Sequence, residues 1–149
     1  ITEQVDRNKV VTNEFIYWKK SYELGLDTID QHHKILVGHI NNLNQSVTEK
    51  APAEKLVMLF NRLLEYADFH FHYEEELMQK YKYSTSADHI KAHQNFALEV
   101  TRFIQEYNES GSVVSIHLIE FLRDWLLLHI IKEDKKLVKE ILSKKILAA

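Results

Sequence analysis

Cysteine is absent from the 149-residue sequence, and helix-breaking residues are scarce, with three Gly and one Pro. The absence of Cys excludes disulfides, thiolate metal sites and iron–sulfur clusters. With 45% hydrophobic and 28% charged residues, the composition is typical of a mostly helical globular protein rather than a β-sandwich or a disordered chain. We therefore expect an all-α domain, and the length suits a single core.

Long apolar runs and a strong excess of one charge are also missing. No uninterrupted apolar stretch approaches the roughly 20 residues that span a bilayer, and no secretory signal is visible. The formal net charge is −3, and the Lys and Arg residues are scattered, which does not indicate a nucleic-acid surface. These absences predict a cytoplasmic protein with no nucleic-acid partner and no membrane contact.

The first residues differ in character from the rest of the chain. Residues 1–14 are polar with weak periodicity, so we interpret them as an arm or linker and assign the domain to residues 15–149. The chain begins with Ile1, which is compatible with a domain cut from a longer protein with covalent neighbour domains, or with a processed chain. The apolar cluster at 15–18 and the residues around Gly25 predict an irregular segment that packs on the core.

Apolar residues then recur at alternating steps of three and four, as in the helices of a bundle. This pattern predicts four helices, at about 30–49, 53–80, 86–108 and 114–129. Asp30 is a good N-cap candidate, and Pro52 suits the first turn of the second helix. Short turns favour an up-down-up-down antiparallel four-helix bundle, followed by a short C-terminal helix at 135–146.

Ionisable residues interrupt these apolar stripes. His70 and Glu74 are four residues apart, so on a helix they offer a neutral nitrogen and an anionic oxygen to the same point. Buried polar groups are costly unless they are paired, hydrogen-bonded or bound to a metal. The inward stripes of the four helices carry seven such residues, which are His33, His70, Glu74, His89, His93, His129 and Asp134.

These residues point to a metal centre in the core. A single His on an apolar stripe is more often a hydrogen-bonded core residue, but seven polar residues on the correct faces favour a shared site. Five imidazoles and two carboxylates suit two metal ions with bridging carboxylates better than one ion. His129 and Asp134 are five residues apart, a step that rotates about 140° on a regular helix. A bulge or break between them would bring both to one point.

The remaining four histidines, His32, His39, His72 and His117, fall outside the inward stripes. His32 adjoins His33 and is therefore expected to face elsewhere, whereas His117 is assigned to the surface or the core boundary. Glu75 and Glu76 are expected to be solvated. The pair His89 and His93 has the spacing of a zinc-protease helix, but Ile90 stands where the catalytic Glu would be, so a metalloprotease is disfavoured.

With these residues in view, the sequence resembles the hemerythrins, and in particular bacterial hemerythrin domains, over about residues 15–140. The resemblance rests on Trp18, Ile29-Asp30 followed by His33, His70-Phe71 with Glu74-Glu75 and Met78, His89 with His93, and His129 with Asp134. The five-residue step between the last two is itself part of the family pattern. His32 is a departure, since bacterial members usually have Gln there, at a position that is not a ligand.

The resemblance implies a non-haem di-iron centre that binds dioxygen reversibly, for oxygen transport, storage or sensing. It implies that His89, His93 and His129 complete one iron, that His33 and His70 hold the second, and that Glu74 and Asp134 bridge them. It also implies an apolar oxygen pocket formed by Leu36, Phe71, Met78, Trp125 and Ile131.

The donor set favours binding over oxygen activation. Ferritin-like di-iron enzymes use carboxylate-rich sets with Glu-x-x-His motifs, and this sequence has no such motif. Anionic ligands stabilise high-valent iron, so an imidazole-rich set makes further oxidation harder. The alternatives are a di-iron enzyme with peroxidase or with oxygen- or nitric-oxide-consuming activity, an iron store or buffer, and a helical bundle with an incidental zinc site.

Overall fold

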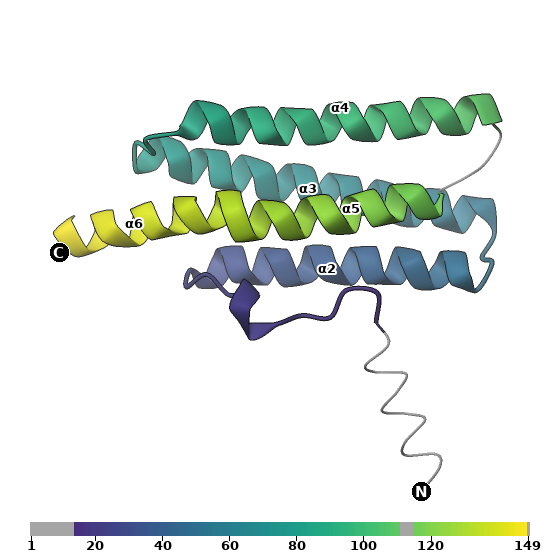
Figure 1. Cartoon of the computed structure of the whole chain (residues 1–149), viewed down its shortest axis with the longest axis horizontal. Coiled ribbons are helices and arrows are strands. Elements are labelled where there is room, and N and C mark those ends of the chain that lie inside the picture. Colours follow the sequence, from purple (N-terminus) through teal and green to yellow (C-terminus); the bar gives the residue numbers. More distant parts are fainter. Residues whose placement is uncertain (1–13, 111–114, 149) are drawn as a thin grey trace, which may run out of the picture.

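The computed structural model describes residues 14–110 and 115–148. The elements are a 3₁₀ turn η1 (Lys20–Tyr22), the helices α2 (Asp27–Thr48), α3 (Ala53–Lys80), α4 (Ser86–Ser110) and α5 (Ile116–His129), the π-helical turn η2 (Ile130–Asp134), and α6 (Lys135–Ala148). Successive long helices run in opposite directions side by side (Figure 1). The predicted all-α, up-down-up-down bundle is thereby confirmed. Residues 1–13 of the predicted arm and the predicted helix start at Val114 lie outside the described residues.

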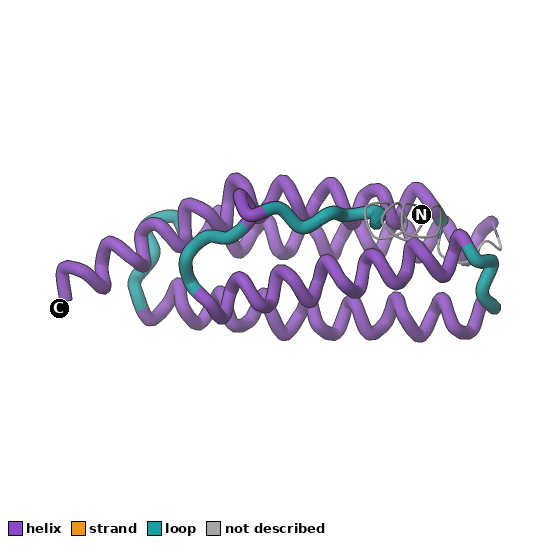
Figure 2. The backbone as a smooth tube through the Cα atoms, turned by 90° about the horizontal axis from the view of Figure 1, so that it is seen from below, coloured by secondary structure: helices purple, strands orange, loops and turns teal. Residues whose placement is uncertain are grey.

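The segment before α2 is irregular and lies along one face of the bundle, as predicted (Figure 2). Ile16 and Tyr22 are buried, and the Trp18 ring packs edge-on against Tyr22 at 5.4 Å between centroids. The side chain of Asn41 in α2 holds the segment in place, because it accepts from the Ile16 N–H at 2.7 Å and donates to the Ile16 carbonyl at 2.9 Å.

The start of α2 differs from the prediction. The helix begins at Asp27 with Leu26 as N-cap, so Asp30 lies inside the first turn and is not the N-cap. Its buried carboxylate reaches back and accepts from the backbone N–H groups of Leu24 and Gly25 at 2.8 and 3.1 Å. Gly25 has φ +106°, a left-handed conformation that favours glycine. Asp30 therefore stabilises the turn before the helix, which the sequence pattern did not reveal.

Two apolar clusters fill the core, and the seven polar residues lie between them along the helices. The larger cluster includes Leu43, Leu63 and Leu122, and the smaller one consists of Met78, Tyr83, Leu137 and Ile141. Along α3, Phe71 belongs to the larger cluster, Met78 to the smaller, and Glu74 lies between them. The polar site is thus closed off by apolar packing in both directions along the bundle axis.

The π-helical turn makes α5 and α6 one continuous rod (Figure 1). The N–H of Lys135 donates to the carbonyl of Ile130, five residues earlier, which is the hydrogen bond of a π-helix. The five-residue turn keeps His129 and Asp134 on the inward face, and both are buried. Of the two arrangements predicted from their spacing, a bulge or a break, the structure shows the bulge.

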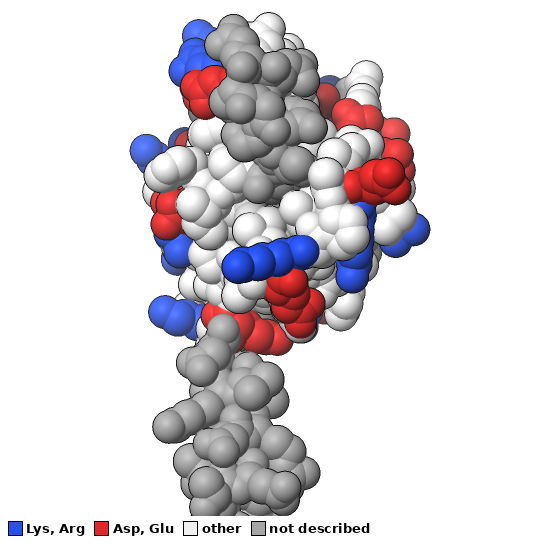
Figure 3. Space-filling model, turned by 90° about the vertical axis from the view of Figure 1, so that its right-hand side faces the viewer, with Lys and Arg blue, Asp and Glu red and all other residues white. Residues whose placement is uncertain are grey.

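The surface carries charges of both signs. Lys or Arg and Asp or Glu are interspersed on the end of the bundle that Figure 3 shows. Pairs such as Lys144 with Glu140, at 3.0 Å, are half-exposed and contribute little to stability. Within the two described ranges, no helix combines the length and the apolar character that crossing a membrane would require.

Replacing Asp30 tests its role at the start of α2. In Asp30→Ala, two backbone N–H groups lose their acceptor, so we expect the free energy of unfolding to fall by about 1–2 kcal/mol in urea denaturation. The matched control is Asp27→Ala in the same turn, where the side chain is exposed and a change of only a few tenths is expected. Equal losses in the two variants would contradict the assignment.

Candidate metal centre

The seven polar residues of the inward stripes meet at one place in the core. His33 comes from α2, His70 and Glu74 from α3, His89 and His93 from α4, His129 from the end of α5, and Asp134 from the end of the π turn. Each is at most 4% exposed. They form two overlapping groups, one of Glu74, His89, His93, His129 and Asp134, and one of His33, His70, Glu74 and Asp134. We call these the five-residue group and the four-residue group.

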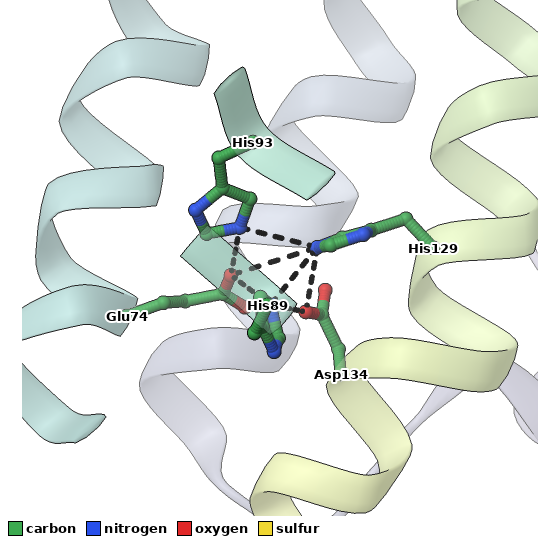
Figure 4. A group of neighbouring side chains, drawn as sticks. All are labelled: Glu74, His89, His93, His129 and Asp134. Carbon is green, nitrogen blue, oxygen red and sulfur yellow. Dashed lines mark hydrogen bonds and ion pairs between the residues drawn. The ribbon is translucent and has the colours of Figure 1, made fainter. Parts of the chain in front are cut away.

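In the five-residue group the side chains point at a common centre (Figure 4). The Nε2 atom of His129 lies 3.1 Å from Nε2 of His89 and 3.2 Å from Nε2 of His93. Donor atoms that share one metal ion, at bond lengths of about 2.1 Å, lie roughly 3 Å apart. The three imidazoles therefore already have the mutual spacing of ligands on one ion.

Glu74 and Asp134 belong to both groups, and each carboxylate directs one oxygen at the imidazoles of one group and its second oxygen at the imidazoles of the other. Asp134 Oδ2 lies 2.8 Å from Nε2 of His33, whereas Oδ1 lies 3.0 Å from Nε2 of both His89 and His129. Glu74 Oε2 lies 3.2 Å from Nε2 of His70, whereas Oε1 lies 3.1 Å from Nε2 of His93. Two carboxylates that divide their oxygens in this way are arranged to join two adjacent ions.

Several of these atoms are buried without a hydrogen bond. Within the described part of the chain, Nε2 of His33 and of His70, Oε2 of Glu74 and both Asp134 oxygens make none of acceptable geometry. Imidazole nitrogens and carboxylate oxygens nevertheless lie within 2.8–3.2 Å of one another here. Buried polar atoms without partners are costly, so this pattern fits metal ligands better than a structural hydrogen-bond network.

The electrostatics of the site favour charged carboxylates and protonated imidazoles. Burial by itself would lower the pKa of His33 and of His129, but Asp134 and Glu74 outweigh it and raise these pKa values to about 9 and about 10. The pKa of His89 is raised for the same reason. Burial raises the pKa of Glu74 and of Asp134, but the surrounding imidazoles prevail and lower both. Positive charge is therefore strongly favoured at this place.

Aromatic rings line the five-residue group. Phe71 stacks on His93, with centroids 4.1 Å apart and an interplanar angle of 12°, and Trp125 stacks on His129 at 4.4 Å and 13°. Leu36 and Met78 are buried, at 3% and 2% exposure. The prediction for Ile131 is wrong, because this side chain is 52% exposed while its neighbour Ile130 is fully buried. The π turn sets which of the two adjacent residues faces inward.

Two residues beside the site were missed by the sequence analysis. His32 was expected to face elsewhere, yet it is buried, and its Nδ1 lies 2.8 Å from Nδ1 of His70. Glu75 was expected to be solvated, yet its Oε2 lies 2.8 Å from Nδ1 of His93. Both residues directly adjoin a stripe position in sequence, so only the packing of the neighbouring helix could reveal these contacts.

The other histidines lie away from the site. His72 and His117 have exposed side chains that pair with Asp68 and Glu120 of their own helices. His39 is half-buried on α2 against the ring of Tyr66. These positions agree with the sequence analysis.

Known proteins share both the sequence pattern and the fold. Residues 24–141 match the family described as the hemerythrin HHE cation binding domain. The bacteriohemerythrin of Pseudomonas aeruginosa is 30% identical over 119 residues, which cover 80% of this chain and 76% of that protein. The myohemerythrin of Theromyzon tessulatum is 29% identical over 119 residues, covering 80% and 88%.

A solved structure gives the same answer. The crystal structure of wild-type hemerythrin superposes with a TM-score of 0.72 at 27% identity, covering 81% of this chain and 93% of that one. The match to the family model spans well over half of the sequence and includes all seven polar core residues. The chain therefore belongs to the hemerythrin family.

Proposed function

We propose that the protein binds dioxygen reversibly at a non-haem di-iron centre, in oxygen transport, storage or sensing. The observation that carries this proposal is the division of the Glu74 and Asp134 oxygens between two groups of imidazoles. A site for one ion would need only one such group. The relatives named bacteriohemerythrin and myohemerythrin support the choice of ligand.

The residues present fit two iron ions. His89, His93 and His129 would hold one ion, His33 and His70 would hold the other, and Glu74 and Asp134 would bridge them. The unpaired atoms that face the two ions would then gain a partner; they are Nε2 of His33 and of His70, Oε2 of Glu74 and both Asp134 oxygens. The ion in the four-residue group has one imidazole fewer, which makes it the better candidate for accepting a further ligand.

When bound, the iron pair supplies the two electrons that dioxygen takes up and returns. The protein's own contribution is to hold the donors and to keep water out. The stacked rings of Phe71 and Trp125 cover His93 and His129, and the two apolar clusters close the site along the bundle axis. In such a dry, apolar setting charge separation is expensive, so a bound ligand is not readily protonated and lost.

The protein is a binder and not an enzyme. The description of the family names cation binding, and membership of this family puts the chain among binding proteins. The imidazole-rich donor set agrees with this, because only two of the seven side chains are anionic.

The proposed function is tested by an absorption spectrum of the reduced, iron-loaded protein before and after air is admitted. We expect a new charge-transfer band on exposure to air and its loss on deoxygenation, with uptake of one dioxygen per chain. Irreversible oxidation on each exposure, with no transient adduct and with turnover of added reductant, would instead indicate an oxidase. An iron pair that never forms would contradict the proposal altogether.

Replacing a bridging carboxylate tests the two-ion arrangement. In Glu74→Ala we expect the iron content to fall from two ions per chain to one or fewer, because both groups lose a donor. The isosteric Glu74→Gln should show the same loss with less change in packing. Glu76→Ala, an exposed position on the same helix, serves as the control and should keep the iron content of the wild type. Unchanged iron content in both Glu74 variants would refute the assignment.

The metal-free protein should become less stable as the pH rises. His33 and His129 have pKa values of about 9 and about 10 when folded, against 6.5 ordinarily, so between these values the folded state holds more protons than the unfolded state. The free energy of unfolding should therefore fall from pH 6.5 to about pH 10, by at most about 1.4 kcal/mol per pH unit for each extra proton.

Urea denaturation of the metal-free protein at pH 6.5 and pH 9.5 measures this slope. The control is Asp134→Asn, which removes the main partner of both imidazoles and should flatten the pH dependence. Stability that rises over this interval in the wild type would contradict the electrostatic description. Because iron must displace these protons, its affinity should change in the opposite direction and increase with pH.

A further inference from the structure

His32 is the one histidine outside the two groups whose side chain reaches them in the described part of the chain. It is 8% exposed, and its Nδ1 lies 2.8 Å from Nδ1 of His70. Three aromatic rings of α3 surround it, those of Tyr66, Phe69 and Tyr73, with centroids 5.8, 5.3 and 4.9 Å away. The ring is therefore held in one orientation, with one nitrogen directed at His70.

The contact between two Nδ1 atoms fixes which nitrogen carries the hydrogen. At 2.8 Å, one Nδ1 must donate its hydrogen and the other must accept it, because two hydrogens would collide and two lone pairs would repel. The other nitrogen of His70, Nε2, points to the shared centre beside Glu74 Oε2. If that Nε2 is a metal ligand, it must be free of hydrogen, so Nδ1 of His70 is the donor and Nδ1 of His32 the acceptor.

We propose that His32 is a positioning residue for the metal ion of the four-residue group. It accepts the hydrogen bond of His70, selects the tautomer in which His70 Nε2 is free to ligate, and strengthens that nitrogen as a donor. Hydrogen bonds of this kind to ligating imidazoles orient the ring and raise its basicity. The role rests on the proposed function, since it needs a metal ion bound by His70.

Only some imidazoles of the two groups have such a partner at the outer nitrogen in the described part of the chain. Of the imidazoles in the two groups, His93 has a comparable outer partner, the carboxylate of Glu75 at 2.8 Å. By contrast, the Nδ1 atoms of His33 and His89 are buried and make no hydrogen bond within the described ranges. One imidazole of each group thus has a contact at its outer nitrogen, Nδ1. In the five-residue group this is His93, whose partner is the carboxylate of Glu75, and in the four-residue group it is His70, whose partner is the imidazole of His32.

The first experiment compares iron binding by the wild type, His32→Leu and His32→Gln. In His32→Leu the acceptor is lost, and we expect the affinity for one of the two ions to fall roughly 10- to 100-fold in competition with a chelator, while the other ion is retained. In His32→Gln the side-chain oxygen can still accept from His70 Nδ1, so affinity should be largely restored. Circular dichroism of the metal-free variants shows whether the fold is kept.

The matched control is His39→Leu. His39 lies on the same helix, and its ring also packs against Tyr66, at 5.7 Å between centroids, but it does not contact either group. Iron affinity should be unchanged in this variant. An equal loss in His39→Leu and His32→Leu would show that packing of α2, and not the hydrogen bond, is responsible.

The second experiment observes the hydrogen bond itself. Zinc is diamagnetic, so ¹⁵N NMR of the zinc-loaded wild type with labelled histidine can identify which nitrogen carries the hydrogen. We expect a hydrogen on Nδ1 of His70 and a coupling across the hydrogen bond to Nδ1 of His32, which a packing contact without a hydrogen bond would not give. A hydrogen on Nδ1 of His32, or a missing coupling, would overturn the proposal.

Failure of this role differs from failure of the proposed function. A wild type that holds two ions, with His32→Leu binding both equally well, contradicts the role of His32 alone. A wild type that never holds a metal pair contradicts the proposed function and the role of His32 with it.

Discussion

The burial of two carboxylates in the middle of a helical bundle is the constraint on which the rest of the structure depends. Glu74 and Asp134 are fully buried, and removing such charges from water is very costly unless positive charge or donors surround them. Five imidazoles from the four helices of the bundle provide this compensation. Because each imidazole must arrive within about 3 Å of a carboxylate oxygen, the axial positions of all four helices are tied together.

Apolar packing offsets the free-energy cost of burying these charged groups. The two hydrophobic clusters supply most of the favourable free energy of burial, and they lie on either side of the polar site along the bundle. The rings of Phe71 and Trp125 continue the packing directly onto two of the imidazoles. The same packing that stabilises the bundle therefore also gives the site its low polarity, in which a metal ion and its donors interact strongly.

Two residues outside the groups, His32 and Glu75, orient imidazoles of the site. His32 and Glu75 each contact the outer nitrogen of one imidazole, and they differ in charge. An anionic acceptor withdraws the hydrogen of His93 more strongly than a neutral imidazole withdraws that of His70. The two groups are therefore unequal in more than the number of their imidazoles.

Helical periodicity in the sequence determined the fold class, the inward face of each helix and the seven polar core residues, because steps of three and four define one face of a helix. The five-residue step from His129 to Asp134 even indicated the π turn. The tertiary structure alone decided features that depend on neighbouring elements. Ile130 rather than Ile131 faces inward because the turn widens there, and His32 and Glu75 reach their imidazoles because an adjacent helix passes beside them. Asp30 likewise binds a preceding turn whose course no periodicity records.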